Sequence, residues 1–171
     1  MGIWQRLFGN TEPRTALVPL YNAVVQTART PAFYSEGAVP DTLDGRFDMV
    51  ALVLSLVLFR LEALGDEGAA PAALVTEVFV NDMDGQLREM GIEYTVGKHI
   101  GKMMSALGGR LTAYRDVRDD DKALSQALVR NVYRGTAPDD DALGFMTSSV
   151  RALDKHISAQ PLSALLAGTL S

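Results

Sequence analysis

One apolar run constrains the fold of this chain more than any other feature of its sequence. Residues 49–59 are apolar except for Ser55, and charged residues border the run at both ends. The run is well short of the roughly 20 apolar residues that a helix needs to cross a bilayer. A helix that is apolar around its whole circumference is buried inside a protein. We therefore predict a central core helix at about residues 42–64.

The sequence on both sides of this run also has helical spacing of apolar residues, and no segment alternates apolar and polar residues as a strand does. Residues 32–40 lack any period and are predicted to be a loop. The fold class is therefore all-α, a single-domain bundle of about six to seven helices. The further helices are predicted at about residues 15–30, 71–90, 95–114, 120–133 and 139–159, with a short last helix after Pro161.

Capping residues set the expected helix ends. Asp41 or Thr42 can accept a hydrogen bond from the free amides at the start of the central helix, and Gly65 can end it. The aspartate runs at 119–121 and 139–141 are expected at helix starts, where negative charge complements the helix dipole. We interpret these runs as caps and not as a binding site.

Residues 1–14 form an expected N-terminal segment with an apolar tip, ahead of a helical domain at 15–171. Trp4, Leu7 and Phe8 make up this tip. Three interpretations are open: a disordered chain end, a turn docked on the bundle, or an anchor for a membrane or a client protein. No secretory signal is recognisable, so the chain is expected to stay in the compartment where it is made.

Composition excludes several classes of function. The chain has 171 residues, 47% of them hydrophobic and 22% charged, which is typical of a globular domain. Its formal charge of -5 argues against general nucleic-acid binding. The absence of cysteine excludes disulfides, thiol nucleophiles and cysteine zinc sites.

No motif for catalysis, metals or cofactors emerges from the sequence. His99 and His156 are the two histidines, and neither has a ligand or catalytic partner at a recognised spacing. Alignment of Gly85 with the invariant glycine of a calcium loop puts Val80 and Gly91 at the two acidic end positions, which rejects calcium. No glycine-rich phosphate loop follows a strand. We predict no catalytic residue, no metal and no cofactor, and hence no enzyme.

Small residues form a stripe along the predicted helix at 95–114. We expect another helix of the same protein to pack closely against this stripe. A homodimer that packs the stripe against itself is the alternative, and it would make the chain a homo-oligomeric structural protein without a client. The stripe contains Gly97, Gly101, Ser105, Gly108 and Thr112.

The sequence contains two charged motifs, one at the start of the central helix and one at the end of the helix after it. Residues 39–48 read Val-Pro-Asp-Thr-Leu-Asp-Gly-Arg-Phe-Asp, and residues 82–91 read Asp-Met-Asp-Gly-Gln-Leu-Arg-Glu-Met-Gly. Together with residues 20–25 and 96–114, they resemble the ubiquinol-cytochrome c reductase assembly chaperone family over roughly residues 15–135. Leu107-Gly108 departs from the family pattern, which has an aromatic pair at that point, and this weakens any expectation of an aromatic grip there.

The resemblance implies a non-enzymatic assembly chaperone. Members of the family help to build respiratory complex III, so the implied partner is newly made cytochrome b or another complex III subunit. Mitochondrial members act near the translating ribosome with a small partner protein. No mitochondrial presequence is recognisable here, so we expect a bacterial member in the cytoplasm, peripheral at the inner face of the inner membrane.

The charged members of these motifs and of the segment that follows are the expected client-binding or partner-binding residues. Two interpretations are open: a structural network of ion pairs, or a polar surface that recognises the partner. Side chains four apart on one helix, such as Asp84 and Arg88, can pair in either case. The predicted binding residues are Asp41, Asp44, Arg46, Asp48, Asp82, Asp84, Arg88, Glu89, Lys98 and Arg110.

Overall fold

A computed structural model describes residues 13–89, 91 and 96–170. Within these residues the fold is all-helical and has no strand, as predicted. The apolar tip with Trp4, Leu7 and Phe8 lies outside the described residues, so its expected anchoring role stays a prediction. None of the helices in the described ranges is long and apolar enough to span a membrane. The elements are η1 (Thr15–Leu17), α2 (Val18–Ala28), α3 (Pro31–Ser35), α4 (Leu43–Ala63), α5 (Asp66–Glu89), α6 (Val96–Arg115), α7 (Asp121–Asn131), α8 (Asp140–Ala159) and α9 (Leu162–Leu166).

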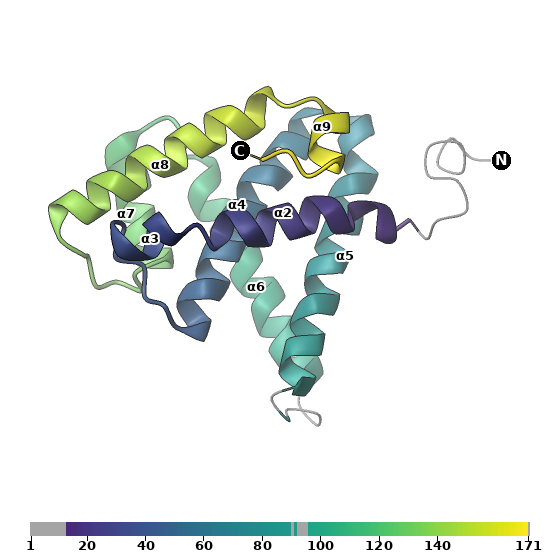
Figure 1. Cartoon of the computed structure of the whole chain (residues 1–171), viewed down its shortest axis with the longest axis horizontal. Coiled ribbons are helices and arrows are strands. Elements are labelled where there is room, and N and C mark those ends of the chain that lie inside the picture. Colours follow the sequence, from purple (N-terminus) through teal and green to yellow (C-terminus); the bar gives the residue numbers. More distant parts are fainter. Residues whose placement is uncertain (1–12, 90, 92–95, 171) are drawn as a thin grey trace.

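Helix α4 runs through the middle of the bundle, as its apolar sequence predicts. Every residue from 48 to 57 is buried, and α4 packs against α2, α5, α6 and α8 (Figure 1). Leu54 lies halfway along α4 and is fully buried. This packing is expected, because a helix that is apolar on all sides is buried among other helices.

The ends of α4 follow the predicted capping chemistry. The Thr42 hydroxyl accepts a hydrogen bond from the Gly45 amide at 3.1 Å. Gly65 follows the helix with a φ of +64°, a conformation that favours glycine. Gly45 is required for another reason: a Cβ atom there would lie 1.9 Å from the Pro40 carbonyl oxygen. The chain at Pro40 therefore packs tightly against the first turn of α4 at Gly45.

The aspartate runs at 119–121 and 139–141 are helix caps, which confirms the interpretation from the sequence. The Asp120 carboxylate accepts a hydrogen bond from the Ala123 amide at 3.0 Å. The Asp139 carboxylate accepts one from the Ala142 amide at 2.8 Å. Both aspartates thus satisfy free amides in the first turns of α7 and α8.

Two helix predictions were wrong in detail. The expected loop at 32–40 contains the short helix α3, because Pro31 occupies the first helical position, where its missing amide costs nothing. Helix α5 begins at Asp66 and not at Pro71. Its first turn carries Asp66 and Glu67, which favour a helix start, and Pro71 falls early enough that only one hydrogen bond near the helix start is lost.

The small-residue stripe of α6 does not pack against the described chain, so that expectation was also wrong. A Cβ atom placed on Gly97, Gly101 or Gly108 would meet nothing within 4 Å. Ser105 and Thr112 are likewise exposed. The helix instead turns its other side, which includes Leu107 and Tyr114, toward the core.

Candidate binding groove

A groove of about 740 Å³ opens between four helices, and both charged motifs contribute to it. Leu43, Asp44, Arg46 and Phe47 come from the first motif, and the second supplies Asp82, Met83 and Gln86. The remaining walls come from α2, α6 and the loop between α7 and α8. This meeting of the two motifs makes the groove the candidate site. Its apolar lining residues are Val25, Leu43, Phe47, Val50, Met83, Met103 and Ala106, and its charged ones are Arg29, Asp44, Arg46, Asp82, Lys102 and Arg134, with His99 and Gln86 beside them.

The apolar floor of the groove is fixed by aromatic contacts. The Phe47 and Phe79 rings lie 6.1 Å apart between centroids. The Arg110 guanidinium lies over the Phe47 ring, 5.6 Å from its centroid. Both contacts restrict the Phe47 side chain. The floor is therefore a preformed surface.

Leu43 presents an apolar side chain to solvent at this groove. It is 58% exposed, and Val18 of α2 is 38% exposed. Val18 does not line the groove. An exposed leucine next to an apolar floor extends the surface that a partner could cover.

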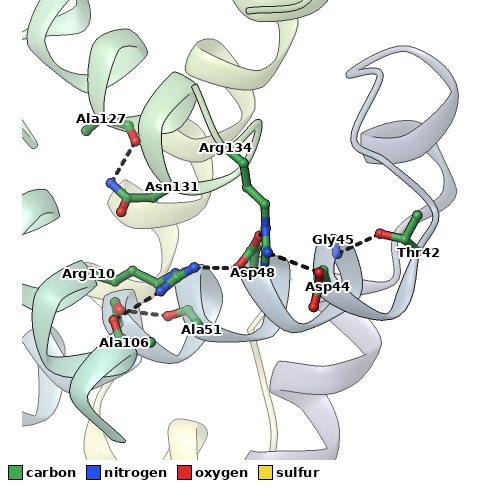
Figure 2. Close-up of polar contacts among 11 residues, drawn as sticks. Thr42, Asp44, Gly45, Asp48, Ala51, Ala106, Arg110, Ala127, Asn131 and Arg134 are labelled. Atoms are coloured by element: carbon green, nitrogen blue, oxygen red, sulfur yellow. Dashed lines mark hydrogen bonds and ion pairs between the residues drawn. The ribbon is translucent and has the colours of Figure 1, made fainter. Parts of the chain in front are cut away.

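A buried carboxylate connects α4 to α6 and to the loop between α7 and α8, both of which line the groove (Figure 2). The Asp48 side chain is fully buried and accepts hydrogen bonds from Arg110 of α6 and from Arg134 in the loop between α7 and α8. Arg134 Nε donates to Asp48 at 2.8 Å, and its NH1 group donates to Asp44 at 3.0 Å. The hydrogen bond to Asp48 raises the pKa of Arg134. Asp48 thus joins three segments that are distant in sequence.

Asp48 and Arg110 form a buried ion pair. For these two residues the geometry favours a structural network of ion pairs over a partner-binding surface. The Arg110 side chain is 13% exposed, and its Nε atom is buried without a hydrogen-bond partner among the described residues. Two cations around one buried carboxylate compensate for its desolvation. A partner in the groove would therefore meet the accessible Asp44 and Arg134 before it met Asp48.

A second polar contact supports the α5 wall. The Tyr21 hydroxyl donates a hydrogen bond to Asp82 at 2.7 Å, and the Gln86 amide donates another at 3.0 Å. Burial, and then the hydrogen bond to Asp82, raise the pKa of Tyr21 far above its ordinary value. The Tyr21 ring also meets the Phe79 ring edge-on. Asp82 is therefore held in a fixed orientation in the groove wall.

The remaining predicted residues lie around or outside the groove. Arg46 lines it and pairs with Asp41 at 2.7 Å, and this hydrogen bond lowers the pKa of Asp41. The predicted pair of Asp84 and Arg88 is present at 2.8 Å, on an exposed part of α5 that does not line the groove. Such exposed pairs contribute about 0–1 kcal/mol. Glu89 and Lys98 are exposed and also lie outside its lining.

Several groove residues were missed from the sequence. Arg29 and Lys102 lie outside both motifs and were not among the predicted binding residues. Arg134 adopts a φ of +53°, which is rare for a residue other than glycine, and only the following Gly135 signals a turn. No group of metal-binding side chains occurs within the part of the chain that the structure describes.

Comparisons with known proteins give a consistent result. Residues 35–171 match the model of a family described as "Ubiquinol-cytochrome C chaperone". The crystal structure of the Cbp3 homolog from Brucella abortus is similar to this chain, with a TM-score of 0.79 and 31% sequence identity. The similarity covers 92% of this chain and 88% of that one. No curated protein matches the sequence.

Proposed function

Because this chain belongs to the ubiquinol-cytochrome c chaperone family, we propose that it binds newly made cytochrome b and thereby assists the assembly of respiratory complex III. The family and the structural relative support a chaperone role and a link to the subunits of that complex. The proposal adds the client and the surface that receives it. It also makes the role non-enzymatic, because the apolar contact area and ion pairs of the groove suit binding of a client.

The observation that carries the proposal is the groove in which both family motifs meet. A chaperone of a membrane protein must cover apolar surface and later release it. Met83 and Met103 supply adaptable apolar contacts to such a surface, because the methionine side chain is unbranched and polarisable. Leu43 adds an exposed anchor, and the charged rim orients the occupant.

A co-purification with a matched control tests the proposal. Leu43→Ser removes an apolar side chain that is 58% exposed, and Val18→Ser makes the same kind of change away from the groove. Each variant should melt close to the parent chain, since neither side chain is in the core. Leu43→Ser should recover much less cytochrome b, while Val18→Ser recovers a normal amount. Full recovery with both variants would reject the groove as the client site.

The place of action is part of the proposal. We expect the chain to work in the cytoplasm and to contact the inner face of the bacterial inner membrane, where its client resides. The apolar residues Trp4, Leu7 and Phe8 support this expectation. Removal of residues 1–8 should lower sedimentation with membrane vesicles and leave thermal melting unchanged. Unchanged sedimentation would reject the anchor.

The alternative of a homo-oligomeric structural protein makes a different prediction. It requires stable self-association of the chain without any client. Light scattering of the purified chain distinguishes the two. A monomer that captures cytochrome b supports the chaperone, and a stable oligomer that captures none supports the alternative.

A further inference from the structure

The rim of the groove carries more positive than negative charge, although the chain as a whole has a formal charge of -5. Four permanent cations line the groove, and two carboxylates face them, so two positive charges are in excess. Such a local reversal of sign creates a field that attracts anionic groups. An occupant can pair only with those cations that have no partner within the chain.

Most of the charged rim residues are already paired within the described chain. Arg134 binds Asp44 and Asp48, and Arg46 binds Asp41. Asp82 accepts hydrogen bonds from Tyr21 and Gln86. These contacts satisfy both lining carboxylates and neutralise two of the four cations, and Asp82 keeps its charge because Tyr21 and Gln86 are neutral. The remaining cations are Arg29 and Lys102.

Arg29 and Lys102 make no ion pair and no side-chain hydrogen bond with any residue that the structure describes. Both are exposed. Arg29 caps the end of α2, and Lys102 lies on α6, so they belong to different walls of the groove. The apolar floor of α4 and α5 contributes to the same groove. An occupant that covers this floor would bring its edges near an available cation on each wall.

We propose that the groove selects an apolar helical segment of the client that carries an acidic side chain, and that this carboxylate pairs with Lys102 or Arg29. The inference rests on the proposed function. A protein segment fits better than a phospholipid because the groove volume of about 740 Å³ suits a cluster of side chains better than two long acyl chains.

Two synthetic peptides test this proposal on the full chain. One is a soluble amphipathic helix of leucine and alanine with one glutamate at the edge of its apolar face, and the other has glutamine at that position. The parent chain should bind the glutamate peptide roughly threefold to tenfold more tightly, as expected for a partly desolvated ion pair. This preference should shrink as salt is raised.

The variants assign the preference to the groove. Lys102→Gln or Arg29→Gln should reduce the preference for glutamate, and the double variant should abolish it. Lys122→Gln changes an exposed lysine on α7 outside the groove, and it should keep the parent preference. Because all three side chains are exposed, the variants should fold like the parent chain.

Several results would overturn the inference. Equal affinity of the parent chain for the two peptides, or no binding of either, would contradict the acidic client segment. So would a Lys102→Gln variant that loses binding to phosphatidylglycerol vesicles but keeps its peptide preference, since the cation would then serve a lipid surface. Failure of the proposed function would look different: capture of cytochrome b would then be independent of Leu43, whichever peptide bound.

Discussion

Arg134 Nε donates a hydrogen bond to the carboxylate of Asp48 at 2.8 Å, although the two residues lie 86 positions apart in the chain. The contact joins the loop between α7 and α8 to the central helix α4. Asp48 also receives Arg110 of α6. The positions of the α6 wall and of this loop relative to α4 therefore depend on one buried carboxylate.

Loss of that carboxylate should destabilise the fold. Asp48→Ala leaves the Arg110 guanidinium, 13% exposed, without its partner. The free energy of unfolding should fall by about 3–5 kcal/mol, as for other buried pairs from which one partner is removed. Urea denaturation measures the change. Asp44→Ala is the control: its side chain is 70% exposed, so the loss should stay within about 1 kcal/mol. Equal losses in the two variants would contradict the network.

The central position of α4 gives a second prediction. Leu54 is fully buried halfway along this helix. Leu54→Ala should lower the free energy of unfolding by about 2–5 kcal/mol, because it removes buried apolar atoms and leaves a cavity. Thermal or urea melting checks this value. A loss of only a few tenths would mean that α4 is not the core of the bundle.

Substitution of the α6 glycines by alanine should stabilise the fold. A Cβ atom at Gly101 or Gly108 meets nothing within 4 Å, so alanine fits at no cost in packing. Each substitution should raise the free energy of unfolding by about 0.5–1 kcal/mol, since glycine weakens a helix interior. Gly45→Ala is the contrast, because its Cβ atom would lie 1.9 Å from the Pro40 carbonyl oxygen. It should destabilise, and a stable Gly45→Ala variant would contradict the tight turn before α4.

Stability should fall at alkaline pH through buried tyrosines. Tyr133 donates a hydrogen bond to the Gly37 carbonyl, and burial raises its pKa from about 10 to about 12. A pKa that is higher in the folded chain favours folding at pH values below the unfolded pKa. This contribution is lost as the pH rises from about 10 to 12. Urea denaturation between pH 8 and 12 should show the loss, with a shallower slope in Tyr133→Phe. An identical slope in that variant would contradict the assignment to Tyr133.

The sequence predicted those parts of the fold that depend on local chemistry. Helix α4 was predicted because its apolar residues cover all of its sides. Its cap was predicted to be Asp41 or Thr42, since either side chain can accept a hydrogen bond from a free amide, and the structure has Thr42 in that role. Proline misled the prediction twice. The residue is compatible with a helix start or a helix end, and here Pro31 begins α3 while Pro71 lies inside α5, behind an acidic first turn.

Single residues of the candidate groove were predicted, but their meeting in one groove was not. The two motifs identified Arg46 and Asp82, but nothing local shows that α4 and α5 bring them to one surface with Lys102 of α6. Arg134 was missed because its role depends on a left-handed backbone conformation in a loop far away in sequence. The open face of α6 was misread because a stripe of small residues looks the same whether it is packed or exposed.

The central claim is that the client lies in the groove beside Leu43, and site-specific photo-crosslinking tests it most directly. A photoreactive amino acid replaces either Leu43 or, as the control, Val18 in cells that produce cytochrome b, and both positions are exposed. We predict a crosslinked product with cytochrome b from position 43 and none from position 18. No product from position 43, or equal products from the two positions, would contradict the claim.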